Sequence, residues 1–165
     1  MTDLFLYTTI WLAVAAWAAT EVLRRIGRGR PAARLVWTAG AALLAVHTAI
    51  AFHARHAWSH DAAYASTSIQ SEALTGVAAG WGLYLNYAFV IVWLADAAWW
   101  RAAPAAYERR SRAVDRALFA FFLFMMANGA VVFAASRLRW LGVLCVAAAL
   151  AARAWPGRRL AAEGN

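Results

Sequence analysis

Long blocks of apolar residues, separated by short polar segments, run along this chain. The blocks are apolar on all sides, and most are about twenty residues long, which is enough to cross a hydrocarbon core of roughly 30 Å. The pattern therefore predicts an all-α fold, a polytopic membrane helix bundle with four to five transmembrane helices. The expected spans cover residues 4–23, 35–54, 76–100 and 117–135, with a short fifth at 141–155.

The last of these segments is ambiguous because its apolar run is short. Trp140 and Trp155 bracket it at a spacing that suits two interfacial aromatic belts. Helical rise over that interval is about 22 Å, which is marginal for a span, so a re-entrant or surface helix is the alternative. In either case we expect a single integral membrane domain over residues 1–165.

Composition supports the bilayer as the solvent. The chain is 64% hydrophobic and only 15% charged, whereas a soluble domain carries roughly 25% charged residues. The net charge is +8 and all sixteen basic residues are arginine. Because these arginines flank the apolar spans, they indicate membrane topology and not a nucleic-acid partner. The one cysteine, Cys145, lies in an apolar span, so the chain can form no internal disulfide.

Arginine placement predicts the orientation. The segments after the first and third spans and the C-terminal tail are rich in arginine, whereas the segment after the second span carries only Arg55. The positive-inside rule then places the N-terminus and the segment after the second span outside. We expect an integral protein of a bacterial inner membrane.

All four histidines fall between His47 and His60. If the second span continues as a helix, His53, His56 and His60 lie on one helical face, where imidazoles can ligate one metal ion. Asp61 follows directly and can ligate the ion or orient an imidazole. The donor set suits zinc, iron, copper or manganese, and the sequence does not choose among them.

A partner for this histidine segment is predicted across the following loop. Thr67-Ser-Ile-Gln70 matches a capping box, which predicts a helix start there and brings Glu72 towards His60. The alternative is that the histidines only anchor the interface or sense pH. A Ser-His-Asp hydrolase is not favoured, because adjacent His60 and Asp61 side chains diverge. Bound haem is not expected, because all the histidines lie on one predicted helix.

The string His53-Ala-Arg-His56-Ala-Trp-Ser-His60-Asp61 resembles a histidine box of membrane di-iron oxygenases such as desaturases and hydroxylases. That resemblance implies bound iron, but the family spreads its histidines over several boxes, usually on the cytoplasmic side. A single-metal site, or one shared between subunits, is easier to build here. Together with Asn86-Tyr-Ala-Phe and Trp99-Trp100, the string also resembles small uncharacterised polytopic bacterial membrane proteins, which implies no function.

Polar residues inside the spans predict helix contacts. His47, Asn86 and Asn128 have similar predicted depths, which suggests an interhelical hydrogen-bond layer. Gly76-Val-Ala-Ala-Gly80 is a G-x-x-x-G pair, typical of a helix-packing face within the chain or between copies, although a loose helix entry is an equal alternative.

Acidic residues near the inner ends of the spans have a simpler interpretation. Glu21 and Asp96 lie at a depth similar to that of Arg24, Arg25, Arg101 and Arg116, so we expect ion pairs there, far from the histidines.

Three classes of function stay open at this point. The first is an extracytoplasmic metal site built from His53, His56, His60, Asp61 and Glu72, in a small membrane metalloenzyme or a metal-handling protein. The second is a structural or assembly subunit of a larger membrane complex, or a homo-oligomer, without metal. The third is a transporter. The sequence names no reaction and does not decide whether the chain is an enzyme.

Overall fold

The computed structural model describes residues 2–26, 30–134 and 136–155, and these residues form helices and no strand. The α-helices are α1 (Thr2–Leu23), α2 (Arg30–His56), α3 (His60–Thr75), α4 (Gly82–Ala102), α5 (Pro104–Glu108), α6 (Arg112–Ala127) and α7 (Arg139–Ala154). A π-helical turn, η1 (Asn128–Val132), continues α6, and a 3-10 turn, η2 (Ser136–Leu138), leads into α7. The expected all-α bundle is confirmed.

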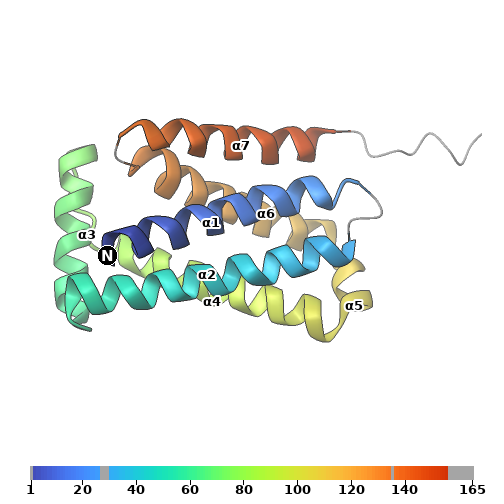
Figure 1. Ribbon diagram of the computed structural model, residues 1–165, viewed down its shortest axis with the longest axis horizontal. Helices are drawn as coiled ribbons and strands as arrows, with labels where there is room; N and C mark the ends of the chain where they lie inside the picture. The colour runs from blue at the N-terminus through green and yellow to red at the C-terminus, as the bar shows by residue number, and fades with distance from the viewer. Residues whose placement is uncertain (1, 27–29, 135, 156–165) are drawn as a thin grey trace, which may run out of the picture.

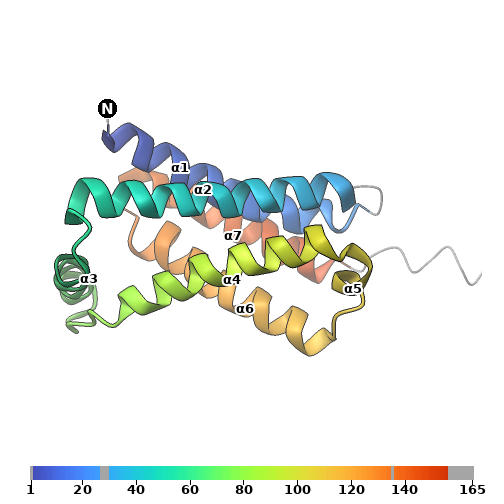
Figure 2. The ribbon, with the colours of Figure 1, turned by 90° about the horizontal axis from the view of Figure 1, so that it is seen from below.

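The helices α1, α2, α4, α6 and α7 run along the long axis of the molecule (Figures 1 and 2). The helix α3 lies across one end of this bundle, and the short α5 lies at the other end (Figure 1). We call these the α3 end and the α5 end. Four segments are long and apolar enough to cross a membrane: α1, α2, α4 and the combined α6–η1 segment, Arg112–Val132. The molecule is therefore an integral membrane protein.

The third and fourth expected spans have different boundaries from those predicted. The third begins at Gly82 and not at Gly76, because Gly76 terminates α3 in the left-handed region (φ 75°). The fourth begins earlier, at Arg112, because Ser111 caps α6 by accepting a hydrogen bond from the backbone N–H of Val114 (3.2 Å). The predicted end of that span, residue 135, lies outside the described residues, as do residues 156–165 of the expected domain.

The helix α7 packs within the bundle although it is short. It has 16 residues, which correspond to about 24 Å of helix. Its backbone lies so close to η1 that a Cβ atom on Gly142 would be 2.1 Å from the carbonyl oxygen of Ala130. Glycine therefore permits this packing. That α7 crosses the membrane as a fifth span stays a prediction.

Large aromatic side chains fill the centre of the bundle. Trp17, Trp93 and Phe122 are fully buried, and the ring of Trp37 lies 5.0 Å from that of Trp93 and 4.9 Å from that of Phe122. Gly40 on α2 makes room for this cluster, since a Cβ there would lie 2.6 Å from the Trp93 ring. Tilted aromatic contacts at such distances add to the stability that dispersion gives. This core lies between the α3 end and the polar groups of the α5 end.

Candidate functional site

The predicted histidine face is interrupted by a sharp turn. The helix α2 ends at His56, Ala57 and Trp58 adopt left-handed backbone conformations (φ 47° and 61°), and α3 begins at His60. Ser59 caps α3, because its hydroxyl accepts a hydrogen bond from the N–H of Ala62 (3.2 Å). The expectation that His53, His56 and His60 share one helical face is therefore wrong, since two helices carry them.

Each of these imidazoles contacts aromatic rings. The His53 ring lies 6.5 Å from that of Trp58, and the His56 ring lies 5.7 Å from that of Phe52. His60 Nδ1 is 3.0 Å from the hydroxyl of Tyr87 on α4. Within the described ranges, no three His, Cys, Asp or Glu side chains form a group that could hold a metal ion. Metal binding by the histidine segment thus stays a prediction.

The two acidic residues of the predicted metal site lie on α3 and are exposed. Asp61 is in its first turn and Glu72 in its last turns, so about three helical turns separate them. The predicted helix start at Thr67 is wrong, because Thr67 lies inside α3 and donates a hydrogen bond to the carbonyl of Ala63 (2.9 Å). The competing cap at Ser59 starts the helix two turns earlier.

The predicted glycine pair does not form a helix face. Gly76 is the C-cap of α3, and Gly80 lies in the loop before α4. Gly80 still permits a close approach, because a Cβ there would lie 2.4 Å from the ring of Tyr64. This contact joins the loop to α3 and not one transmembrane helix to another.

The predicted polar layer of His47, Asn86 and Asn128 has no hydrogen bonds between its members in the described part of the chain. His47 Nδ1 lies 3.1 Å from the carbonyl oxygen of Leu6 and 3.3 Å from Oγ1 of Thr9, both on α1. The amide of Asn128 donates to the carbonyl of Phe124 in its own helix (3.0 Å), and Asn86 is exposed. His47 therefore links α1 to α2, and the other two residues lie apart from it.

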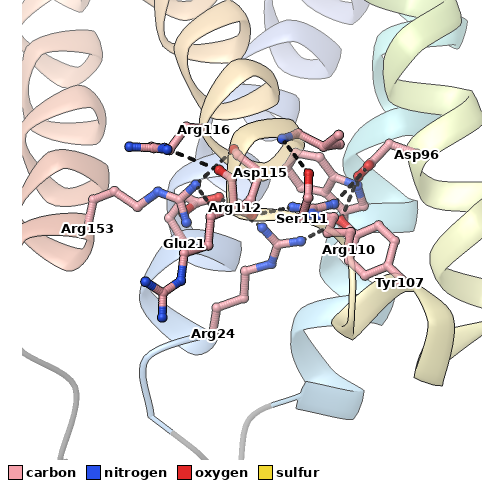
Figure 3. A network of polar contacts seen from close by, with 12 residues as sticks. Glu21, Arg24, Asp96, Tyr107, Arg110, Ser111, Arg112, Asp115, Arg116 and Arg153 are labelled. Atoms are coloured by element: carbon pink, nitrogen blue, oxygen red, sulfur yellow. Dashed lines mark hydrogen bonds and ion pairs between the residues drawn. The ribbon is translucent and has the colours of Figure 1, made fainter.

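A denser group of polar side chains lies at the α5 end, and we call it the polar network (Figure 3). It consists of three carboxylates, three guanidinium groups, one phenol and one indole: Glu21, Asp96, Asp115, Arg24, Arg110, Arg153, Tyr107 and Trp37. These residues come from α1 and the turn after it, from α2, α4, α5, α6 and α7, and from the loop between α5 and α6. The network thus joins the ends of all α-helices except α3.

Asp96 accepts hydrogen bonds from three donors. One oxygen accepts from Trp37 Nε1 (2.8 Å) and from the hydroxyl of Tyr107 (2.7 Å), and the other accepts from Arg110 (3.0 Å). The side chains of Asp96 and Arg110 are 5% and 7% exposed. A carboxylate can be buried to this extent only because these donors replace the hydrogen bonds that water would otherwise make to it.

Tyr107 connects Asp96 to Arg24. The Arg24 guanidinium donates to the Tyr107 hydroxyl (2.5 Å) and lies 4.5 Å from the centre of the Trp100 ring. Trp100 and Tyr107 stack with their rings 4.7 Å apart. Burial raises the pKa of the Tyr107 phenol well above its ordinary value, so the hydroxyl keeps the proton that it donates to Asp96. The short helix α5 is held against the bundle by these contacts.

Asp115 connects α6 to α7. Its two carboxylate oxygens accept from Arg110 and from Arg153, each at 2.5 Å. Arg153 also lies over the ring of Phe119, 4.5 Å from its centre. The last turn of α7 is therefore attached to the start of α6 by a charged hydrogen bond.

The sequence predicts only part of this network. The expected pairing of Glu21 with Arg24 is confirmed (3.4 Å), but Asp96 pairs with Arg110 in place of the arginines expected at its depth. The available signal was the recurrence of an acidic residue near the same end of three spans, at Glu21, Asp96 and Asp115. Each of these acids requires a cation or several donors once it is buried.

Comparisons of the chain with protein-family models, with curated proteins and with solved structures gave no match. Its function therefore has to be inferred from its own geometry.

Proposed function

We propose that this chain is a structural subunit of a larger membrane complex, or of a homo-oligomer, in a bacterial inner membrane. The proposal rests on the polar network, in which negative and positive charges are equal in number. Its three carboxylates are matched by three guanidinium groups, and most of its hydrogen bonds are made within it. These buried charges hold helices together, which is a structural task.

The space inside the network supports the same interpretation. The cavity that the network lines has a volume of about 10 Å³. Pockets for small-molecule ligands measure roughly 300–1,000 Å³, so this cavity has room for a water molecule and not for a substrate.

The histidine segment suits an interfacial role under this proposal. His53 lies against Trp58, His56 lies against Phe52, and Trp58 is 63% exposed. Aromatic side chains with one polar edge are favoured at the level of lipid headgroups. These rings would anchor the α3 end at one membrane surface while α3 lies across the bundle.

Isolation of the complex from native membranes tests the proposal. A tagged chain is extracted in a mild detergent and analysed by native electrophoresis and by cross-linking with mass spectrometry. We expect a particle heavier than one chain, with stable partners or further copies, and no stoichiometric metal in the same preparation. A monomer that carries about one transition metal per chain would contradict the proposal and would favour the metal site.

A matched pair of variants makes the metal result decisive. A His56→Ala/His60→Ala double variant removes two of the predicted ligands, whereas His47→Ala removes a histidine outside the predicted set. Under the structural proposal, neither variant changes the metal content. Loss of metal only in the double variant would establish the metal site.

A further inference from the structure

An apolar groove lies between α1 and α7, which pack side by side in the bundle (Figure 1). Its volume is about 440 Å³, within the range of roughly 300–1,000 Å³ that is typical of ligand sites. Small side chains alternate with larger ones along its walls, so they leave space for a long apolar group. The groove is lined mainly by Ala18, Ala19 and Val22 of α1 and by Leu144, Cys145 and Ala148 of α7.

The groove is open to the outside of the bundle. Ala19 and Ala148 are exposed, and the side chains of Val22 and Leu144 are 38% and 66% exposed. The helix α1 is long and apolar enough to cross the membrane, so its exposed apolar residues face the hydrocarbon chains of lipids. An acyl chain is therefore the apolar group that has direct access to the groove.

An arginine and a tryptophan lie where the groove reaches the α5 end. The N–H of Arg25 donates to the carbonyl of Val22 (3.0 Å) in a tight turn, in which side chains three positions apart lie above one another. The N–H of Trp155 still donates to the carbonyl of Ala151 (2.9 Å), so the helical register of α7 extends to this residue. Trp155 follows Ala148 by two helical turns on the same face and is 69% exposed. A cation and an indole ring thus end the groove.

Arg25 lacks an anionic partner in the part of the chain that the structure describes. The carboxylates of the polar network already pair with its own arginines, and Glu108, the remaining described acid at the α5 end, pairs with Arg30 (2.5 Å). Arg25 is exposed and makes no ion pair with a described residue. A phosphate group complements a guanidinium in charge and in hydrogen-bond geometry. The charge at this end therefore favours an anionic ligand from outside the chain.

We propose that the groove binds one anionic phospholipid. One acyl chain lies between α1 and α7, and the phosphate accepts hydrogen bonds from the guanidinium of Arg25. Trp155 lies at the level of the glycerol esters, where indole rings are favoured. No covalent bond forms or breaks. The inference does not depend on the proposed assembly into a larger complex.

A second copy of the chain is the competing occupant of the groove. A twofold contact places the same surface on both sides of the interface, so each copy would bring its Arg25 to the same end of the contact. Like charges that face each other across an interface are unfavourable. A phospholipid places a negative charge at that point, so charge complementarity favours the lipid.

Native mass spectrometry of the full chain in detergent tests the role of Arg25. The chain is titrated with phosphatidylglycerol and with phosphatidylcholine that carry identical acyl chains. We expect one phosphatidylglycerol molecule to bind about fivefold more tightly, the factor that one arginine contributes near an anionic surface. Arg25→Gln should abolish this preference, whereas Arg101→Gln, at an exposed arginine on α4, should keep it. Equal affinity of the natural chain for both lipids, or an equal effect of the two variants, would overturn the proposal.

A second pair of variants tests the groove. Ala148→Leu places a larger side chain in it, so we expect weaker binding of both lipids. Ala98→Leu makes the same change at an exposed alanine on α4, outside the groove, and should bind as the natural chain does. Unchanged lipid binding in Ala148→Leu would overturn the proposal. A dimer of the natural chain that Ala148→Leu separates would overturn it in favour of the second copy.

Photo-crosslinking of the natural chain gives a test that needs no variant. The chain is reconstituted in liposomes with phosphatidylglycerol that carries a diazirine in one acyl chain, and the labelled peptides are identified by mass spectrometry. We expect the label to concentrate on residues 18–23 and 144–148, and unlabelled phosphatidylglycerol to reduce it more than phosphatidylcholine does. A label spread evenly over the exposed faces of all the helices would contradict a defined site.

Discussion

A single buried aspartate illustrates how residue-level physics shapes the α5 end. Asp96 lies on an apolar helix with 6% of its surface exposed, where an uncompensated charge would be very costly. Its three donors come from α2, α5 and the loop before α6. The cost of burying the charge is thus offset only when three separate segments reach their final positions. Asp96 therefore specifies this arrangement more than it adds stability.

Removal of that charge is the prediction at this scale. Asp96→Asn keeps the size of the side chain but leaves the buried Arg110 with Asp115 as its one carboxylate partner. Breaking a buried pair by removing one partner costs about 3–5 kcal/mol, so we expect a lower unfolding midpoint in detergent, measured by circular dichroism. Asp61→Asn, on the exposed start of α3, is the matched control and should change little. Equal midpoints for the two variants would show that the Asp96 charge does not hold the helices.

At the scale of elements, two serines and two glycines decide where helices end and meet. Ser59 and Ser111 begin α3 and α6 through their side-chain caps. Gly76 ends α3, and Gly142 allows α7 to lie against η1. In the π-helical turn η1 the N–H of Phe133 donates to the carbonyl of Asn128, five residues earlier (2.8 Å). This turn carries Ala130, whose carbonyl lies against Gly142 of α7.

Two glycine substitutions test the attachment of α7. Gly142→Ala places a Cβ 2.1 Å from a backbone oxygen, whereas Gly129→Ala places one where nothing lies within 4 Å. Overpacking of this kind typically costs about 1–3 kcal/mol, so we expect Gly142→Ala to lower the unfolding midpoint and to increase the mobility of a spin label at Cys145. Gly129→Ala should leave both unchanged or slightly raise the midpoint. The opposite order of the two variants would show that α7 does not pack against η1.

At the scale of the whole molecule, arginine is distributed unevenly between the two ends. The polar network and the segments around α5 hold most of the described arginines. The α3 end holds Arg55, together with Arg137 in η2 and Arg139 at the start of α7. The positive-inside rule then favours the α5 end in the cytoplasm.

Reporter fusions test the orientation. A reporter that is active only outside the cytoplasm, inserted after Asp61 in the first turn of α3, is expected to be active. The same reporter inserted after Arg109, between α5 and α6, is expected to be inactive. The reverse pattern at both sites would invert the molecule and contradict the proposed topology.

Sequence alone determined the class of fold. The length and uniform hydrophobicity of the blocks decide that the chain forms membrane-spanning helices, because a bilayer requires each backbone polar group to be paired within the segment. These are local properties, and the confirmed helices α1, α2, α4 and α6 follow from them. The ion pair between Glu21 and Arg24 was also predictable, because the two residues are three positions apart in the sequence.

Only the tertiary structure decided how the polar residues combine. The predicted histidine face required one unbroken helix from His53 to His60. The left-handed residues Ala57 and Trp58 and the cap at Ser59 break that helix. The pattern of apolar residues gives no sign of this break. The network at the α5 end joins Asp96 to donors 59, 11 and 14 residues away in the sequence. The spacing of apolar residues carries no information on such distant pairs. Which polar residues meet depends on which helices lie side by side, and that depends on close packing between helices, as at Gly40 and Gly142.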